Sequence, residues 1–166
     1  MAVRKIHVHP DSVLKQAAQA VSRFDSALES FITDLTDTLG AAPGCVGIAA
    51  PQVGHGEQII IVDVPSKKQA TAHGTLVLIN PEISEWEGSV MGREGCLSVP
   101  DFTGNVLRAE RVTVQAQDRH GDNRRYEFEG FEARVVQHEI DHLHGLLFLD
   151  RLVSRRTDLF RRKVYK

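Results

Sequence analysis

The sequence is poor in cysteine, and it lacks both a long apolar run and a strong net charge of one sign. Its cysteines are Cys45 and Cys96, so a secreted scaffold held together by several disulfides is not indicated. No run approaches the roughly 18 to 20 apolar residues that a membrane span needs. The opening residues also lack the apolar core of a secretory signal. We therefore expect a cytoplasmic protein with free thiols.

Length and charge balance predict one domain with no general affinity for polyanions. The 166 residues suit a single domain, residues 1–166, with a sizeable core. A formal net charge of -2 argues against binding to DNA or to a membrane surface, and a monomer is the default expectation. Residues 151–166 depart from this balance, because they form a strongly basic C-terminal tail.

Apolar periodicity predicts helices toward both ends of the chain and strands between them. Helical spacing indicates helices over residues 12–21, 28–39 and 132–147. Apolar or alternating runs predict strands over residues 59–64, 76–81, 112–117 and 124–131, the last two as an antiparallel hairpin. Because helices and strands do not alternate along the chain, we expect an α+β fold.

The strongest chemical signal is the segment His138-Glu139-Ile140-Asp141-His142. Histidines four residues apart lie on one face of a helix, so both imidazoles can bind one ion. A glutamate directly after the first histidine can reach water on such an ion and move protons. The alternative is a helix with two incidental histidines, but all three residues would then have to coincide.

A hydrolytic metal site usually needs a third protein ligand and one open position. Sites of the His-Glu-x-x-His type commonly take that ligand from downstream. Here the position of a downstream third histidine is Phe148, and no glutamate follows Glu139. His144, Asp150 and Asp158 fit no known third-ligand pattern. We therefore expect the third ligand to come from upstream.

Two upstream segments, residues 92–100 and 44–52, carry the best candidates for the rest of the site. The first is rich in glycine and contains Cys96, whose thiolate is a strong metal ligand. A lone cysteine is more often a small buried apolar residue than a metal ligand. Because the helix motif lacks a third ligand, however, we expect Cys96 to supply it. The second segment combines small residues with the amide donor Gln52, although alone it would more often be a tight turn.

Together the three segments resemble the motifs of the peptide deformylases, in the same order and at similar spacing. Residues 94–98 read Glu-Gly-Cys-Leu-Ser and residues 137–142 read Gln-His-Glu-Ile-Asp-His, and both match the family's patterns throughout. Residues 45–52 match the remaining pattern except at its opening glycine, which is Cys45 here. The likeness extends over nearly the whole chain, from the His-Pro-Asp-x-x-Leu opening to the Phe-Leu-Asp-Arg segment after the motif helix.

The resemblance implies a fold, a reaction and a ligand set. The fold would be α+β, with antiparallel β-sheets packed around a central metal-binding helix. The reaction would remove the formyl group from the initiator formylmethionine of newly synthesised polypeptides. Cys96, His138 and His142 would bind the metal. Glu139 would take a proton from the activated water and pass it to the leaving amine.

The same resemblance implies the roles of the remaining site residues. The oxyanion would be stabilised by the metal, by the side chain of Gln52 and by the backbone N–H of Leu97. Gly47 would pair with the backbone of the substrate. Ile48 and the helix near His138 would line the methionine pocket.

Further expectations concern residues around these motifs. Thr103 stands where several family members carry an arginine, so contacts beyond the first substrate residues are expected to differ. Arg108 is expected to pair with Glu94 as a structural support. Asp141 is expected either to orient a residue that supports the metal ligands or to lie on the helix surface. Cys45 is expected to be buried and inert.

The identity of the metal depends on which argument is followed. A cysteine and two histidines suit zinc on simple ligand grounds. The resemblance favours one ferrous ion in the cell, with nickel, cobalt or zinc as substitutes. Ferrous iron beside Cys96 would make the site sensitive to oxygen and peroxide.

Two other functions stay open, and each function implies different partners. An endopeptidase would need a downstream third ligand, and a non-enzymatic relative would bind ribosomes or nascent chains. An enzyme would act on N-formylmethionyl nascent peptides. The basic tail, residues 151–166, would either dock on ribosomal RNA or form a solvated terminal helix. A bacterial cytoplasm fits these expectations best.

Overall fold

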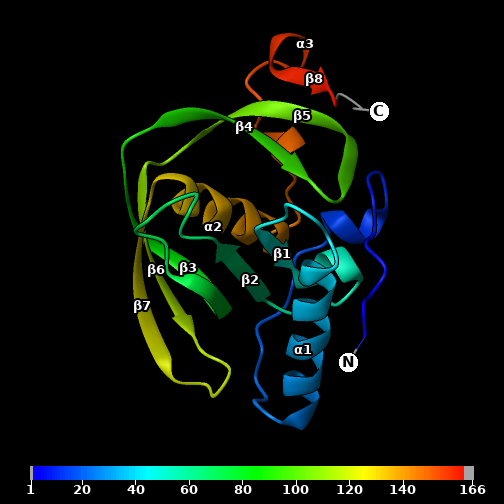
Figure 1. Ribbon diagram of the computed structural model, residues 1–166. Helices are drawn as coiled ribbons and strands as arrows, with labels where there is room; N and C mark the ends of the chain where they lie inside the picture. Colours follow the sequence, from blue (N-terminus) through cyan, green and yellow to red (C-terminus); the bar gives the residue numbers. More distant parts are fainter. Residues whose placement is uncertain (1, 163–166) are drawn as a thin grey trace.

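The computed structural model describes residues 2–162, in which a central helix lies between two antiparallel sheets (Figure 1). Within this range the larger sheet has the strand order β1-β2-β3-β6-β7 and the smaller sheet has the order β4-β5-β8. The strands are β1 Gly47–Ala49, β2 Ile59–Val64, β3 Gly74–Glu87, β4 Val90–Cys96, β5 Val99–Arg108, β6 Arg111–Gln117, β7 Asn123–Glu129 and β8 Leu159–Arg161. The predicted α+β fold with antiparallel sheets around the motif helix is confirmed.

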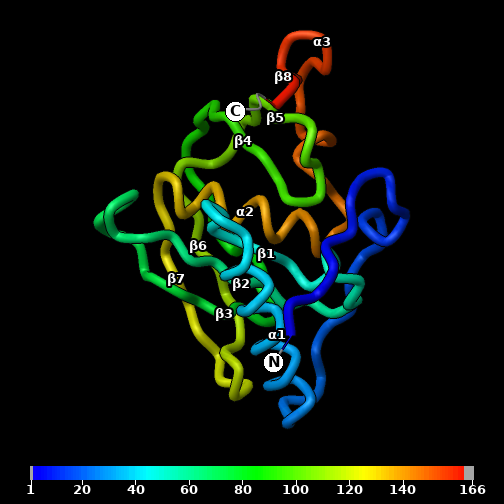
Figure 2. Tube along the Cα trace, turned by 45° about the vertical axis from the view of Figure 1, so that its right-hand side comes forward, coloured from blue at the N-terminus to red at the C-terminus, as the bar shows by residue number. Residues whose placement is uncertain are grey.

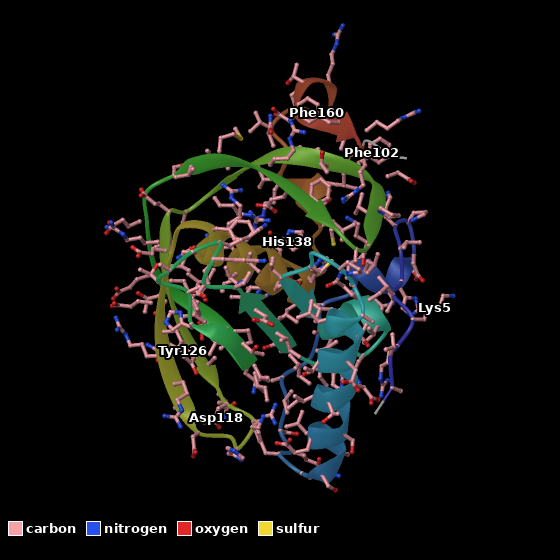
Figure 3. The ribbon with its side chains drawn as sticks, viewed as in Figure 1. Lys5, Phe102, Asp118, Tyr126, His138 and Phe160 are labelled. Carbon is pink, nitrogen blue, oxygen red and sulfur yellow. The ribbon has the colours of Figure 1, made fainter. Side chains whose placement is uncertain are left out.

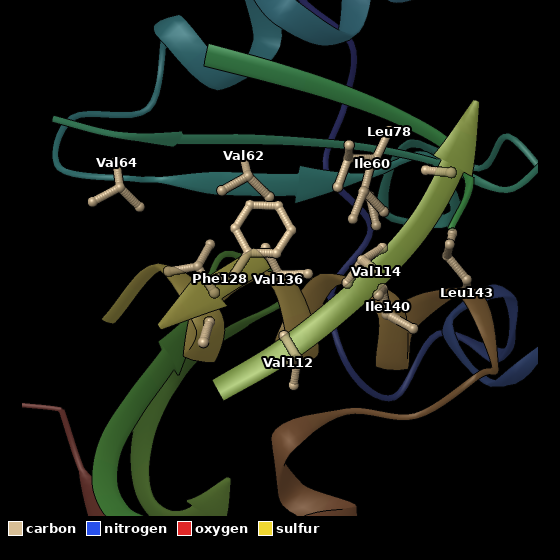
Figure 4. Close-up of a cluster of buried hydrophobic side chains, with 14 of the residues drawn as sticks. Ile60, Val62, Val64, Leu78, Val112, Val114, Phe128, Val136, Ile140 and Leu143 are labelled. Carbon is tan, nitrogen blue, oxygen red and sulfur yellow. The ribbon is translucent and has the colours of Figure 1, made fainter. Parts of the chain in front are cut away.

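The central helix, α2 (Gly130–Leu143), is surrounded by protein. All of its residues from Glu132 to Leu143 are buried. Figure 4 shows the apolar contact between its inner face and the larger sheet. The side chains in contact are Ile60, Val62, Leu78, Val114 and Phe128 from the strands and Val136, Ile140 and Leu143 from the helix. Fully burying each such side chain stabilises the fold by roughly 1.5–3 kcal/mol. The helix therefore holds the residues that it carries in fixed positions.

The opposite face of the larger sheet is covered by α1 (Ser26–Gly40). The side chain of Asp25 caps this helix by accepting a hydrogen bond from the backbone N–H of Leu28 at 3.0 Å. The buried stripe of α1 contacts Ile59 and Ile61 of β2, whereas Ile60 faces α2. Because β2 is covered on both faces over residues 59–62, its sequence is apolar there and not alternating, and Asp63 is its exposed residue. The helix predicted over residues 28–39 is confirmed.

The helix predicted over residues 12–21 is wrong beyond its first turn. Only a 3-10 helix, η1 (Ser12–Lys15), forms there. The following residues are extended, because their backbone groups bind distant parts of the chain. The N–H of Ala18 donates to the carbonyl of Leu143, and the N–H of Val21 donates to the Asn80 side chain, both at 2.8 Å. Ala18 and Val21 of this stretch are buried, but in an extended segment, and Ala17 is exposed.

The ends of several elements differ from the prediction. The strand predicted over residues 76–81 is part of the much longer β3, and β4, β5 and β8 were not predicted. The motif helix ends at Leu143 and not at residue 147, because Gly145 adopts a φ of +75° and lies against the backbone of Lys15. Within residues 2–162, no helix has the length and apolarity that crossing a membrane requires.

The basic tail is not a single terminal helix. Within the described residues it begins at the last residue of η3 (Phe148–Arg151) and continues through the four-residue helix α3 (Arg155–Asp158) to β8. Figure 2 shows α3 and β8 beside the smaller sheet, where β8 pairs with β5. The prediction of a solvated terminal helix therefore fits α3 alone, which has no buried residues. Residues 163–166 of the tail lie outside the described range.

Candidate metal centre

Three candidate ligands meet where the end of β4 lies against α2. Cys96 is the last residue of β4, and His138 and His142 occupy successive turns of α2. Their ligand atoms lie within 4.8 Å of one another, and the thiol sulfur of Cys96 is 3.4 Å from Nε2 of His142. Figure 3 shows His138 in the interior between the two sheets. The strand and helix thus bring together Cys96 and His142, which the sequence places 46 residues apart.

The two histidines differ in their protonation in the metal-free site. Burial and the nearby His138 lower the pKa of His142, which keeps its imidazole in the neutral, metal-binding form. Burial also opposes charge on His138, but hydrogen bonds with Cys96 and Glu94 outweigh it and raise the pKa of His138. A metal would therefore displace a proton there. One thiolate and two imidazoles around one point form a donor set that fits zinc or another divalent transition metal.

The carboxylate of Glu94 supports the first histidine and is itself held by two arginines. It accepts a hydrogen bond from Nδ1 of His138 at 2.9 Å, which leaves Nε2 to face the ligand cluster. Arg108 binds both of its oxygens at 2.9 Å, and Arg134 donates to one of them at 2.7 Å. Burial alone would raise the pKa of Glu94, but these hydrogen bonds hold it well below its usual range. The expected Arg108–Glu94 pair is present.

Asp141 extends this ionic network toward the C-terminal segment. It is buried on α2 and accepts hydrogen bonds from Arg108 at 2.5 Å and from Arg151 at 3.0 and 2.8 Å. Of the two roles left open for Asp141, the structure therefore shows the orienting one and not a place on the helix surface. A continuous chain of charges leads from Arg151 through Asp141 and Arg108 to Glu94 and the metal site.

Glu139 has the environment of a general base. Its side chain is buried beside the ligand cluster, and its Oε1 atom has no hydrogen-bond partner among the described residues. Burial raises the pKa of Glu139 from 4.5 to about 7, against the opposing charge of His138. A carboxylate with a pKa near neutrality can accept and return a proton at physiological pH.

Gln52 reaches the site from the other side, on the 3-10 helix η2 (Ala50–Val53). Its Oε1 accepts a hydrogen bond from the backbone N–H of Ala49 at 2.9 Å, which fixes the orientation of the amide. The Nε2 group then donates to the hydroxyl of Ser98 at 3.1 Å and toward the sulfur of Cys96 at 3.5 Å. The amide N–H groups of Gln52 are therefore directed at the ligand cluster.

Gln52, Cys96, His138 and Glu139 line a cavity of about 520 Å³. One wall is the segment that enters β1, from Pro43 to Gly47, and the opposite wall is the end of β4, from Arg93 to Leu97. The floor is α2. The lining side chains from α2 are Phe131, Arg134, Val135, His138 and Glu139. The cavity is large enough to hold several residues of an extended peptide beside the ligand cluster.

Most of the residues predicted from the sequence lie at this cavity, with one difference. Gln52, Leu97 and Gly47 line it, and a Cβ on Gly47 would be only 2.7 Å from the Glu139 carboxylate. Ile48 instead points away, because successive residues of a strand face opposite sides. Its side chain is fully buried in the cluster beneath α1.

Cys45 also differs from the expectation. It is half-buried and free, and it lines the cavity, although a fully buried residue was expected. Burial raises the pKa of the Cys45 thiol, and the nearby Cys96 and Glu139 raise it further. The thiol is therefore held in its protonated, less nucleophilic form.

Two arginines at the cavity, Arg134 and Arg162, were not foreseen. Arg134 precedes the motif by one helical turn, where its spacing from His138 could have suggested a place on the same face. Arg162 comes from the C-terminal segment, 66 positions after Cys96 along the chain, and no local pattern connects the two. Only the pairing of β8 with β5 brings it to the site.

Comparisons with known proteins agree on one family. A family model described as polypeptide deformylase matches residues 3–158. A peptide deformylase of Thermodesulfovibrio yellowstonii is 42% identical over 98% of this chain and 97% of its own length. A peptide deformylase of Heliobacterium modesticaldum is 47% identical over 92% of this chain and 95% of its own length.

Solved structures give the same result. A peptide deformylase from Legionella pneumophila superposes with a TM-score of 0.84 at 41% identity, covering 92% of this chain and 88% of that one. A peptide deformylase from Ehrlichia chaffeensis in complex with actinonin gives a TM-score of 0.87 at 33% identity, covering 94% and 92%. The likeness therefore extends over nearly the whole chain in both sequence and structure.

Proposed function

The chain belongs to the peptide deformylase family, and we propose that Cys96, His138 and His142 hold the divalent metal of a deformylase whose general base is Glu139. The protein is a metal-dependent hydrolase that removes the N-formyl group from the initiator formylmethionine of newly synthesised polypeptides. The proposed roles rest on one observation. The ligand cluster lies beside the buried carboxylate of Glu139, at a cavity large enough for a peptide. A bound divalent metal supplies Lewis acidity and lowers the pKa of water.

Glu139 moves the proton in the proposed reaction. Its Oε1 has no hydrogen-bond partner among the described residues, and its raised pKa lets it accept a proton near neutral pH. After attack, the same carboxyl group returns the proton to the amine nitrogen as the C–N bond breaks. Formate and a free methionine amino group are the products.

Gln52 and Leu97 stabilise the negative charge that develops on the formyl oxygen. The Gln52 amide is already directed toward the ligand cluster, because Ala49 holds its oxygen. Leu97 lies in the turn after Cys96, where its backbone N–H can donate from the other side. Donors that are fixed before the reaction cost no reorganisation when the charge forms.

The edge of β1 is the proposed docking site for the peptide backbone. Among the described residues, this strand is outermost in the larger sheet and pairs only with β2. An extended peptide can therefore add to its free edge, with Gly47 as the pairing residue. The methionine side chain would lie against Phe131 and Val135 of α2, because both line the cavity and offer apolar surface.

We propose ferrous iron as the metal in the cell, with zinc, nickel or cobalt as substitutes. The family resemblance supports iron, whereas the ligand set of one cysteine and two histidines also suits zinc. We also propose that the protein acts as a monomer in a bacterial cytoplasm. A loss of activity in air that added peroxide accelerates would support iron, since zinc does not undergo redox chemistry.

The function is tested by the initial rate of deformylation of a formyl-Met peptide after anaerobic reconstitution with ferrous iron. We expect turnover by the wild type and loss of turnover in the Glu139→Ala variant. Glu82→Ala, which removes an exposed carboxylate on β3, is the matched control. No turnover despite a filled metal site would contradict the deformylase assignment and favour a non-enzymatic relative. Cleavage of an unformylated peptide would instead favour an endopeptidase.

The basic C-terminal tail is a proposed contact with the ribosome. Arg155 and Arg156 are exposed on α3, which packs none of its side chains into the core. A cationic surface of this kind attracts the phosphates of ribosomal RNA. We expect Arg155→Gln with Arg156→Gln to reduce co-sedimentation with ribosomes and to leave deformylation of a free peptide unchanged. Unaltered co-sedimentation of this double variant would end the proposal.

A further inference from the structure

The mouth of the cavity is lined by cationic side chains, and three of them are already engaged. Arg134 donates to Glu94 and to two backbone carbonyls. Arg93 donates to Asn105 and Thr103, and its guanidinium lies 3.7 Å from the centre of the Phe160 ring. The Lys68 ammonium lies 4.8 Å from the centre of the Phe131 ring.

Arg162 is the cation at this mouth whose side chain is unengaged. Its guanidinium has no hydrogen-bond acceptor or carboxylate partner within residues 2–162, although it lines the cavity. An arginine side chain carries five N–H donors in a planar fork, a geometry that matches a carboxylate. A free guanidinium at a peptide-binding cavity is therefore a ready site for an acidic group.

The backbone that carries Arg162 is fixed, so its side chain does not reach the cavity by chance. Strand β8 pairs with β5, with Phe160 opposite Thr103, and the N–H of Arg162 donates to the carbonyl of Asp101 at 2.8 Å. Figure 3 shows Phe160 beside the smaller sheet, where it pairs with β5. The Arg93–Phe160 contact adds a second attachment.

The guanidinium itself lies over the strand that ends in the metal ligand. One of its terminal nitrogens would be 2.7 Å from a Cβ built on Gly95, the residue before Cys96. The absence of a side chain at Gly95 is what admits the arginine there. The positive charge also reaches across the cavity, because it lowers the otherwise raised pKa of Cys45 on the opposite wall.

The carboxylates near this mouth do not neutralise Arg162. Glu94 is shared by Arg108, Arg134 and His138, and Glu139 is buried beneath the peptide site. The field at the entrance is therefore positive. A peptide with its formyl group at the metal must leave the cavity past this charge.

We propose that Arg162 is a specificity-determining residue that binds a carboxylate side chain at the second or third position of the formylated peptide. The inference rests on the proposed function, which places the formyl carbon beside Cys96. An extended chain advances about 3.3 Å per residue. The side chains that follow methionine therefore pass Gly95 and the Arg162 guanidinium. Aspartate or glutamate early in the nascent chain would be preferred over a neutral residue, and lysine would be disfavoured.

The expected effect is moderate, because the site is partly exposed to solvent. Charge pairs of this kind change binding by roughly two- to five-fold and weaken as salt rises. The contact lies away from the reacting atoms and persists through the reaction. It should therefore lower KM for acidic peptides and leave kcat nearly the same.

The test compares kcat and KM of the metal-loaded protein on amidated peptides that differ in charge. The substrates are formyl-Met-Asp-Ala, formyl-Met-Ala-Asp, formyl-Met-Ala-Ala and formyl-Met-Lys-Ala. We expect a KM about two- to five-fold lower for the acidic peptides than for the alanine peptide. Arg162→Gln should abolish this preference, and Arg162→Lys should keep part of it. Arg161→Gln is the matched control, because it removes the same charge from the adjacent exposed residue outside the cavity lining.

The outcomes separate this inference from the proposed function. Turnover of all peptides with no charge preference, or a preference that survives in Arg162→Gln, would overturn the role of Arg162 and leave the deformylase assignment intact. No turnover of any formylated peptide would overturn both. If Arg162→Gln and Arg161→Gln reduced the preference equally, the preference would come from the summed charge of the tail. That outcome would contradict a specific contact with Arg162.

Discussion

The carboxylate of Glu94 accepts a hydrogen bond from Nδ1 of His138 at 2.9 Å, in a position where neither side chain is more than a tenth exposed. This contact fixes which nitrogen of the imidazole faces the metal site. Glu94 is fixed in turn by Arg108 and Arg134. The orientation of a metal ligand therefore depends on charges that lie outside the ligand cluster.

Replacing Glu94 should weaken metal binding and destabilise the fold together. In Glu94→Gln the amide keeps the shape but not the charge, so Arg108 and Arg134 lose their buried counter-ion. We expect metal affinity to fall about 10- to 100-fold. We also expect the free energy of unfolding to fall by roughly 3–5 kcal/mol, the usual result of breaking a buried pair. Competition with a chelator and denaturant unfolding measure the two effects.

Glu87→Gln is the matched control for this prediction. Its carboxylate pairs with Arg111 at 2.7 Å, but both side chains are more than half exposed. Solvent-exposed pairs contribute little, so neither metal affinity nor stability should change measurably. Equal effects of Glu87→Gln and Glu94→Gln would contradict the special place of Glu94 in the network.

The raised pKa of Glu139 predicts a stability profile that depends on pH in the metal-free protein. Its pKa is 4.5 as a free side chain and about 7 in the fold, chiefly because burial disfavours the charged form. Between these values the folded protein holds a proton that the unfolded chain has lost. The free energy of unfolding should therefore fall as pH rises from about 4.5 to 7.

The variant Glu139→Gln isolates this contribution, because its amide does not titrate. We expect its stability relative to the wild type to improve by roughly 3 kcal/mol between pH 4 and pH 8. Denaturant unfolding of both metal-free proteins across this range provides the measurement. Parallel profiles for the two proteins would mean that the fold does not raise the pKa of Glu139.

Removing the amide of Gln52 should slow the chemical step. Gln52→Ala takes away the donor directed at the ligand cluster, so we expect kcat to fall about 100- to 1,000-fold. Substrate binding should change much less, because the donor acts on charge that develops in the transition state. Steady-state kinetics on a formyl-Met peptide give the two quantities.

Gln115→Ala provides the comparison for Gln52. Gln115 is exposed on β6 of the larger sheet and does not line the cavity. Its loss should leave kcat and KM at wild-type values. A fall in kcat of less than ten-fold for Gln52→Ala would mean that its amide does not contact the reacting oxygen.

A methyl group on Gly47 should displace the proposed base. In Gly47→Ala the new Cβ would be 2.7 Å from the Glu139 carboxylate and 2.9 Å from the Val135 side chain. Both contacts are too close, so Glu139 must move, and a misplaced catalytic group can cost on the order of 100-fold in rate. We expect a loss of kcat of that size, with destabilisation of about 1–3 kcal/mol from overpacking.

Gly40→Ala tests whether the loss of kcat is specific to Gly47 or follows from any glycine-to-alanine substitution. A Cβ on Gly40, the last residue of α1, would meet no atom within 4 Å. We expect wild-type activity and equal or slightly higher stability, since alanine favours the helix. If Gly47→Ala retained its activity, β1 or the Glu139 side chain would be able to shift without a loss of kcat.

Several features follow from local sequence alone, because neighbours along the chain decide them. The two motif histidines share a face of α2 because a helix repeats every 3.6 residues. The apolar stripe of α1 and the hairpin of β6 and β7 likewise follow from periodicity within one element.

The prediction failed where distant partners replaced local hydrogen bonds. Residues 16–21 have helical spacing, but they bind the end of α2 and the loop before β2, so they are extended. The strands β4 and β5 lack a strong apolar pattern, and their pairing with each other and with β8 defines them. The side chain of Ile48 faces the core because the register of β1 on β2 orients it.

What the sequence by itself determined is the family, the proposed ligand set and the proposed base, since these depend on which residue types stand at fixed spacings. Only the tertiary structure decided that two arginines hold Glu94, that Asp141 joins Arg151 to this network, and that Arg162 enters the cavity over Gly95. The physical reason is that such contacts join residues 10 or more positions apart, on different elements. Chain folding sets their distances, and no local periodicity encodes them.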